Sequence, residues 1–142
     1  MLKQISVFLE NKPGKLAELA VLLSDNKVNL RALSLAETED FGIVRLIADD
    51  VYSAATVLRS AGYVASVKDV LAVEMQDTPG GLSAVLKALG ENGINLEYMY
   101  AFTAHKQGCA NMIFKVNDTE KAAELLSAAA IHVLEQDELA DL

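Results

Sequence analysis

The sequence has one cysteine, two prolines, no tryptophan and only 6% aromatic residues. A single cysteine excludes an internal disulfide framework. We expect Cys109 to be a small apolar filler in a strand, because free cysteine is commonly buried. The histidines, His105 and His132, stand far apart, without a Cys-x-x-Cys or His-x-x-x-His spacing. We therefore expect no metal site and no cofactor.

Basic residues are also scarce, since 12 Lys and Arg face 20 Asp and Glu, for a formal net charge of -8. Such an acidic chain repels a phosphate backbone, so nucleic acid is not an expected partner. No window reaches the roughly 18 apolar residues of a membrane helix, and the N-terminus has no apolar signal region. These absences predict a cytoplasmic protein without a membrane partner.

The chain does contain an internal repeat. The segment 11–16, Asn-Lys-Pro-Gly-Lys-Leu, returns 66 positions later as Asp-Thr-Pro-Gly-Gly-Leu at 77–82. Val-Asn-Leu at 28–30 returns at the same offset as Ile-Asn-Leu at 94–96. The repeat predicts two domains, residues 1–68 and 69–142. Units this small, in a chain that is 52% hydrophobic, predict further burial between units or between chains, with a homodimer or larger assembly as the default.

Each copy reads strand, helix, strand, strand, helix, strand from its hydrophobic periodicity. This order predicts an α+β fold of two tandem ferredoxin-like βαββαβ sandwiches, each with an antiparallel sheet. Only Lys68-Asp69 separates the last strand of the first copy from the first strand of the second. In the first copy we expect strands at 4–9, 29–37, 42–48 and 63–67, with helices after 13–14 and after 50. In the second we expect strands at 70–75, 96–102, 110–116 and 131–134, with helices after 79–80 and after 118.

The two Pro-Gly steps are the main candidates for a binding site. Proline tolerates the first helical position, and the helix start then offers free N–H groups at the positive end of its dipole. A glycine there lets a carboxylate ligand approach. Asn29 and Asn95 carry both a donor and an acceptor, which suits an α-amino acid. The alternative is that Pro-Gly only turns the chain and Asn only caps the helix-to-strand corner.

The repeated Pro-Gly-x-Leu, apolar helix and Val/Ile-Asn-Leu pattern resembles the ACT domain family. These are small regulatory modules that bind amino acids and are fused to enzymes such as aspartate kinase and phosphoglycerate dehydrogenase; this chain looks like a stand-alone tandem pair. In that family the ligand sits between two domains, held by the loop after strand one and the start of strand two. The resemblance therefore implies one set of ligand-binding residues in each copy. These are Asn11, Pro13, Gly14, Leu16, Asn29 and Leu30, and Asp77, Pro79, Gly80, Leu82, Asn95 and Leu96.

We expect a non-catalytic regulatory module that binds a small ligand, foremost a free amino acid, at the interface between ACT domains. A small or branched aliphatic amino acid is favoured, and the regulated partner is another enzyme or regulator. One alternative is a structural interaction pair that has lost ligand binding. Another is an enzyme on the same fold, although the sequence has no repeated acid–base pair, Ser/His/Asp set or phosphate loop, and so no catalytic residue is assigned.

The two copies differ at the candidate site, because Asn11 is replaced by Asp77 and Lys15 by Gly81. One loop therefore carries a cation near the anion-binding end, and the other carries a carboxylate able to hold an ammonium group. We predict that the two sites bind ligand unequally and, in the limiting case, that only one is occupied. Isothermal titration calorimetry gives the stoichiometry, and full occupancy of both sites with one affinity would contradict this prediction.

Overall fold

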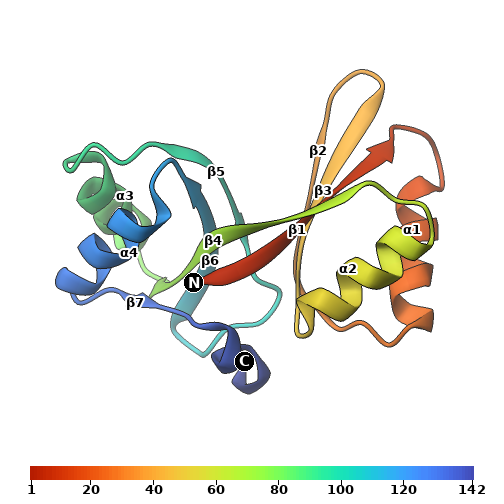
Figure 1. The fold of residues 1–142 in the computed structure, drawn as a ribbon. Helices are drawn as coiled ribbons and strands as arrows, with labels where there is room; N and C mark the ends of the chain where they lie inside the picture. Colours follow the sequence, from red (N-terminus) through yellow and green to blue (C-terminus); the bar gives the residue numbers. More distant parts are fainter. The chain divides into compact units, whose positions relative to one another are not determined.

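The computed structural model describes residues 1–142, which form two compact units. The N-terminal unit is Lys3–Lys68, and the C-terminal unit is Asp69–Leu142 together with Met1–Leu2. In each unit two helices cover one face of an antiparallel sheet (Figure 1). The predicted α+β fold with two βαββαβ repeats is confirmed. No helix is both long and apolar enough to cross a membrane.

The sheet of the N-terminal unit has the order β2-β3-β1, with the beginning of β4 next to β1. Phe8 N–H donates to Val64 O over 3.1 Å, just before β4 begins. Alternate residues of β1 (Ile5, Val7 and Leu9) are buried, as the period of two requires, and pack against the helices. The elements are β1 (Leu2–Glu10), α1 (Lys15–Asp25), β2 (Leu30–Glu37), β3 (Phe41–Ala48), α2 (Val51–Ser60) and β4 (Ala65–Gln76).

The sheet of the C-terminal unit has the order β7-β4-β6-β5, which repeats the first topology. Val73 pairs with Met112 of β6 on one side and with Val133 of β7 on the other. Leu71, Val73 and Met75 of β4 form the core with Val85 and Leu89 of the first helix. Beyond β4 the elements are α3 (Gly81–Gly90), β5 (Leu96–Ala101), β6 (Cys109–Val116), α4 (Thr119–Ala128), β7 (His132–Val133) and the 3-10 helix η1 (Gln136–Asp141).

Two features differ from the prediction. The two strands expected on either side of Lys68-Asp69 are one continuous strand, β4, because no glycine, proline or asparagine is present there to turn the chain. The acidic tail, for which the sequence predicted no structure, forms η1. Glu135 and Glu138 make a capping box at its start, and the terminal ammonium of Met1 pairs with Glu135.

A small polar cluster fixes the start of β2 to the end of β3. Arg31 Nε lies 2.6 Å from Asp49 Oδ1, and the Asn29 side-chain amide donates to Asp49 Oδ2 over 2.9 Å. The Arg31 hydrogen bond holds the pKa of Asp49 below its ordinary value, against a smaller opposing effect of burial, and the Asn29 amide adds to the lowering. Asn29, one of the predicted ligand-binding residues, is therefore engaged within its own unit.

The lowered pKa of Asp49 predicts a definite pH dependence. A carboxylate with a lowered folded-state pKa contributes stability above its unfolded value of about 3.9, and this stability is lost as pH falls through the lower folded-state pKa. In Arg31→Met the NMR titration of the Asp49 carboxyl carbon is expected to move up toward the ordinary value. The variant is expected to be less stable than the parent near pH 6, with the difference vanishing at the acid end; an unmoved titration midpoint would contradict this account.

Candidate functional site

The Pro79-Gly80 step of the C-terminal unit forms a type II β-turn between β4 and α3. Gly81 N–H donates to Thr78 O over 3.0 Å, and Gly80 has φ of +91° and ψ of -12°, the values of the third turn position. That left-handed conformation favours glycine, and proline suits the position before it. The turn therefore sends the chain from the sheet directly into the helix.

The N-terminal unit repeats this turn with the same geometry. Lys15 N–H donates to Lys12 O over 3.3 Å, and Gly14 has φ of +82°. The prediction that proline occupies the first helical position is wrong for both copies. Pro13 and Pro79 each stand one residue before the glycine that caps the helix, because a type II turn places proline second and glycine third.

The start of α3 keeps two N–H groups without partners. Gly81 N–H is used by the turn, and Ala84 N–H makes the first helical bond, to Gly80 O over 3.1 Å. The N–H groups of Leu82 and Ser83 lie between these two, and no side chain caps the helix. They stand at the positive end of the helix dipole, so the start of α3 is suited to an anion.

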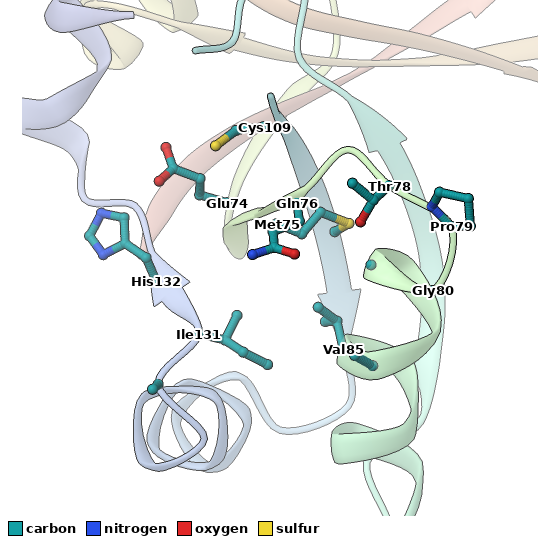
Figure 2. A pocket seen from close by; sticks show the side chains of 13 residues that line it. Glu74, Met75, Gln76, Thr78, Pro79, Gly80, Val85, Cys109, Ile131 and His132 are labelled. Atoms are coloured by element: carbon teal, nitrogen blue, oxygen red, sulfur yellow. The ribbon is translucent and has the colours of Figure 1, made fainter. Parts of the chain in front are cut away.

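A cavity of about 550 Å³ opens beside this turn. It is bounded by the end of β4, the start of α3 and the residues that lead from α4 into β7. Figure 2 shows Val85 and Gly80 on one side, Ile131 and His132 on the other, and Gln76 between them. The volume lies within the range of small-molecule sites. The lining residues are Glu74, Met75, Gln76, Thr78, Pro79, Gly80, Gly81, Ala84, Val85, Cys109, Ala130, Ile131 and His132.

Small residues on α3 keep this cavity open. A Cβ atom at Gly81 would lie 2.1 Å from the carbonyl oxygen of Gln76, so no side chain fits there without a backbone shift. Ala84, one helical turn later, adds only a methyl group to the wall. Opposite them, Ala130 has φ of +57°, an uncommon conformation for a residue with a Cβ atom.

The N-terminal unit has a smaller cavity, of about 350 Å³, at the corresponding place. At positions where the larger cavity has small residues, this cavity is lined by large or charged ones. Lys15 and Glu18 stand where Gly81 and Ala84 stand in α3, and their side chains form an ion pair of 3.6 Å across the cavity rim. On the strand side, Phe8, Phe41 and Val64 replace Glu74, Cys109 and His132, respectively.

Glu74 is the one carboxylate in the wall of the larger cavity. Its Oε2 atom is buried and makes no hydrogen bond. The Lys106 ammonium lies 3.6 Å from Oε2, which is close enough for an ion pair but beyond hydrogen-bond distance, and Lys106 is itself 63% exposed. Asn111, the cross-strand neighbour of Glu74, also has a buried oxygen without a donor. This part of the unit therefore has more buried acceptors than donors.

His132 connects the cavity to the C-terminal helix η1. Its Nε2 atom lies 2.8 Å from Glu138 Oε1. The Glu135 N–H that Glu138 accepts, and then the His132 bond, hold the pKa of the Glu138 carboxyl below its ordinary value. No group of three or more His, Cys, Asp or Glu side chains is placed to hold a metal ion.

The structure places the predicted ligand-binding residues at two separate ends of each unit. Pro79 and Gly80 line the large cavity, and Asp77 precedes them with its N–H bonded to Gly108 O. Leu82 follows on the helix and is 39% exposed. Asn95 directly precedes β5, and its N–H donates to Asn117 Oδ1 over 2.9 Å, while Leu96 packs against the core.

In the N-terminal unit the same separation holds. Asn11 and Leu16 line a third cavity, and the Asn11 amide donates to Glu37 Oε2 over 3.3 Å. Pro13 and Gly14 form the adjacent turn, but they line none of the described cavities. Asn29 and Leu30 line a fourth cavity at the other end of α1. A helix of 11 residues is about 16 Å long, so one unit cannot bring both halves of the predicted site to one small ligand.

Sequence reasoning missed the residues that make the large cavity distinctive. Glu74 and His132 were given no role in a binding site, and Cys109 was expected only to fill a strand. A signal did exist: comparing the copies position by position shows a charge gained at Glu74 and an ion pair lost at Gly81 and Ala84. Only the Gly81 difference entered the prediction.

Comparisons with known proteins agree with this architecture. The family described as "ACT domain pair" matches residues 1–142. A crystal structure of a protein from Bacteroides thetaiotaomicron has a TM-score of 0.92 and 34% identity over 99% of this chain and 96% of that one. The ligand-free regulatory subunit of aspartate kinase from Thermus thermophilus has a TM-score of 0.67 at 16% identity, over 89% and 91% of the two chains, which shows a shared fold.

The regulatory subunit of aspartate kinase from Thermus flavus gives a similar result, with a TM-score of 0.62 at 17% identity over 89% of this chain and 91% of that one. No curated protein matches the sequence. The family match extends over the whole chain, and both copies have the repeated turn, helix and strand order that the resemblance implied. The chain therefore belongs to the ACT domain pair family.

Proposed function

We propose that this ACT domain pair is a non-catalytic regulatory module that binds a free α-amino acid. The observation that carries the proposal is the start of α3, where two N–H groups without partners lie next to a cavity of about 550 Å³. Such a helix start suits a carboxylate, and the apolar part of the cavity suits an aliphatic side chain. Contacts to the strand-start residues Asn29 or Asn95 would require a second ACT domain, as the family resemblance implies.

Binding is better supported than catalysis. Cys109 and His132 both line the cavity, and a cysteine beside a histidine is a common nucleophilic pair. No hydrogen bond joins them, and His132 Nε2 is directed to Glu138 instead.

The regulated partner is proposed to be another protein, because a ligand acts by favouring one of two arrangements that a partner distinguishes. We further propose that the protein acts in the cytoplasm as a homodimer or larger assembly. Support for assembly comes from exposed apolar side chains on neighbouring strands: Phe8 is 56%, Phe41 53% and Val64 67% exposed. A contiguous apolar surface of this kind is typical of contact surfaces.

One observation supports the alternative function, a protein-interaction domain that has lost ligand binding, for the N-terminal unit alone. In the N-terminal unit the Asn11 and Asn29 amides and the Lys15 ammonium all have partners within the unit. This unit is suited to contacts with protein while the other binds ligand.

A thermal-shift panel of the full chain with the free amino acids at millimolar concentration tests the proposed function. A ligand at about 100 times its Kd stabilises the folded protein by roughly 2.7 kcal/mol, which moves the Tm by several degrees in a chain of this size. One responding amino acid, with no response to an unrelated sugar, is the expected result. If no amino acid moves the Tm, the protein does not bind free amino acids and the proposal fails.

A further inference from the structure

We propose that the cavity of the C-terminal unit is the amino-acid site, that Glu74 recognises the ammonium group, and that the N-terminal counterpart is too narrow to bind the same ligand because Lys15 and Glu18 replace Gly81 and Ala84. This inference rests on the proposed function and adds a location, a recognition group and a stoichiometry to it. The ligand is a small aliphatic amino acid bound as a zwitterion.

Glu74 is the group proposed to bind the ligand's ammonium. Its buried Oε2 has no hydrogen bond, and leaving a buried acceptor unsatisfied costs free energy. Glu74 belongs to the cavity wall, where its carboxylate lies on the same side as the His132 ring (Figure 2). The group at the same position of the N-terminal unit is the apolar ring of Phe8, so the carboxylate is not a shared requirement of the fold.

Backbone N–H groups are proposed to bind the ligand's carboxylate. Ala72 O accepts from Leu134 N–H on the β7 side of β4, whereas Asp77 N–H donates to Gly108 O on the opposite side. Hydrogen-bonding groups of an antiparallel strand alternate in direction, so Gln76 N–H is directed to the same side as Ala72 O. The residues that precede β7 make no hydrogen bond to the Gln76 N–H, because the pairing of β7 with β4 ends at Glu74. Gln76, a lining residue, therefore offers a donor to a carboxylate in the cavity, and the free N–H groups of Leu82 and Ser83 follow the lining residue Gly81.

The side-chain end is apolar. Met75, Val85 and Ile131 also line the cavity and give it an apolar wall for the ligand's side chain. Burial of one branched aliphatic side chain against them favours binding. A charged ligand side chain would lose its hydration there without gaining a partner.

The N-terminal cavity offers none of these features together. Lys15 and Glu18 stand where α3 has Gly81 and Ala84, so their longer side chains take up space at the cavity rim, where they form an ion pair of 3.6 Å. Its strand-side wall is formed by Phe8, Phe41 and Val64, and its volume is about 350 Å³. The inference therefore predicts one ligand per chain.

Charge recognition is tested with Glu74→Gln, which keeps the size of the side chain and removes the charge. The probes are L-alanine, L-valine, L-leucine and L-isoleucine, each compared with its des-amino carboxylic acid by calorimetry. Loss of one charged hydrogen bond is expected to weaken binding by roughly 10- to 100-fold. The parent is expected to prefer the amino acid over the des-amino acid, and Glu74→Gln is expected to lose that preference.

Lys106→Met is the matched control for loss of the Lys106–Glu74 ion pair. If Glu74 acts only by holding Lys106, both variants should weaken binding alike, and the inference would be wrong. If Glu74 holds the ligand, Lys106→Met removes a competing ammonium and is expected to bind as tightly as the parent or more tightly. Circular dichroism verifies that each variant is folded.

The location is tested with Ala84→Leu, which fills the cavity from an exposed helical position, and with Ala17→Leu as a matched exposed position on α1 that lines no described cavity. Ala84→Leu is expected to abolish binding, whereas Ala17→Leu is expected to retain it. Cys109, the only cysteine, provides a direct probe. The responding amino acid at about 100 times its Kd is expected to slow iodoacetamide labelling by up to about 100-fold.

The outcomes separate this inference from the proposed function. Binding that persists unchanged in Ala84→Leu and leaves Cys109 labelling unchanged would place the ligand elsewhere, so the function would stand and the inference would fail. Two ligands per chain of equal affinity would also overturn it. No binding by any amino acid would refute both.

Discussion

The carbonyl oxygen of Gln76 and the first residue of α3 approach each other so closely that only glycine fits at position 81. A Cβ atom there would lie 2.1 Å from that oxygen. The N-terminal unit makes the same turn with Lys15 at the corresponding position, so this close approach is a property of the C-terminal unit and not of the turn itself. The width of the cavity depends on this contact, because a side chain at position 81 would have to displace the backbone that forms part of the cavity wall.

The two copies illustrate how one scaffold supports different roles. In α1 the opposite charges of Lys15 and Glu18 neutralise each other at the rim, whereas α3 has glycine and alanine there and the wall carries Glu74. A ligand in the C-terminal cavity would lie against the residues that follow α4, and the His132–Glu138 contact connects these residues to η1. For such a ligand to regulate a partner, it must bind one arrangement of these elements more tightly than another.

Much of the fold was predictable from the sequence because the repeat, the strand alternation and the Pro-Gly turns are local signals. The turn type was not predicted, since proline before a helix suits both the first helical position and a type II turn, and only the hydrogen bond of Gly81 distinguishes them. The unbroken β4 was missed because polar Lys68-Asp69 resembles a turn, and aspartate is common in turns. The position of Glu74 in the cavity wall depends on which strands are neighbours and on their register, and both are set by tertiary structure. The predicted ligand-binding residues remain a prediction.

The loop between β5 and β6 spans residues 102–108, whereas its counterpart between β2 and β3 spans only 38–40, and the longer loop carries Lys106. This loop therefore acts as a tethered counterion, whose ammonium lies 3.6 Å from the carboxylate that the proposed ligand would use. A tethered competitor lowers the apparent affinity for the ligand, because the ligand can bind only during the fraction of time in which the competitor is away from the site. The set point of such a sensor, the ligand concentration at which it responds, is then encoded in the length and charge of a surface loop. It can change without altering the cavity itself.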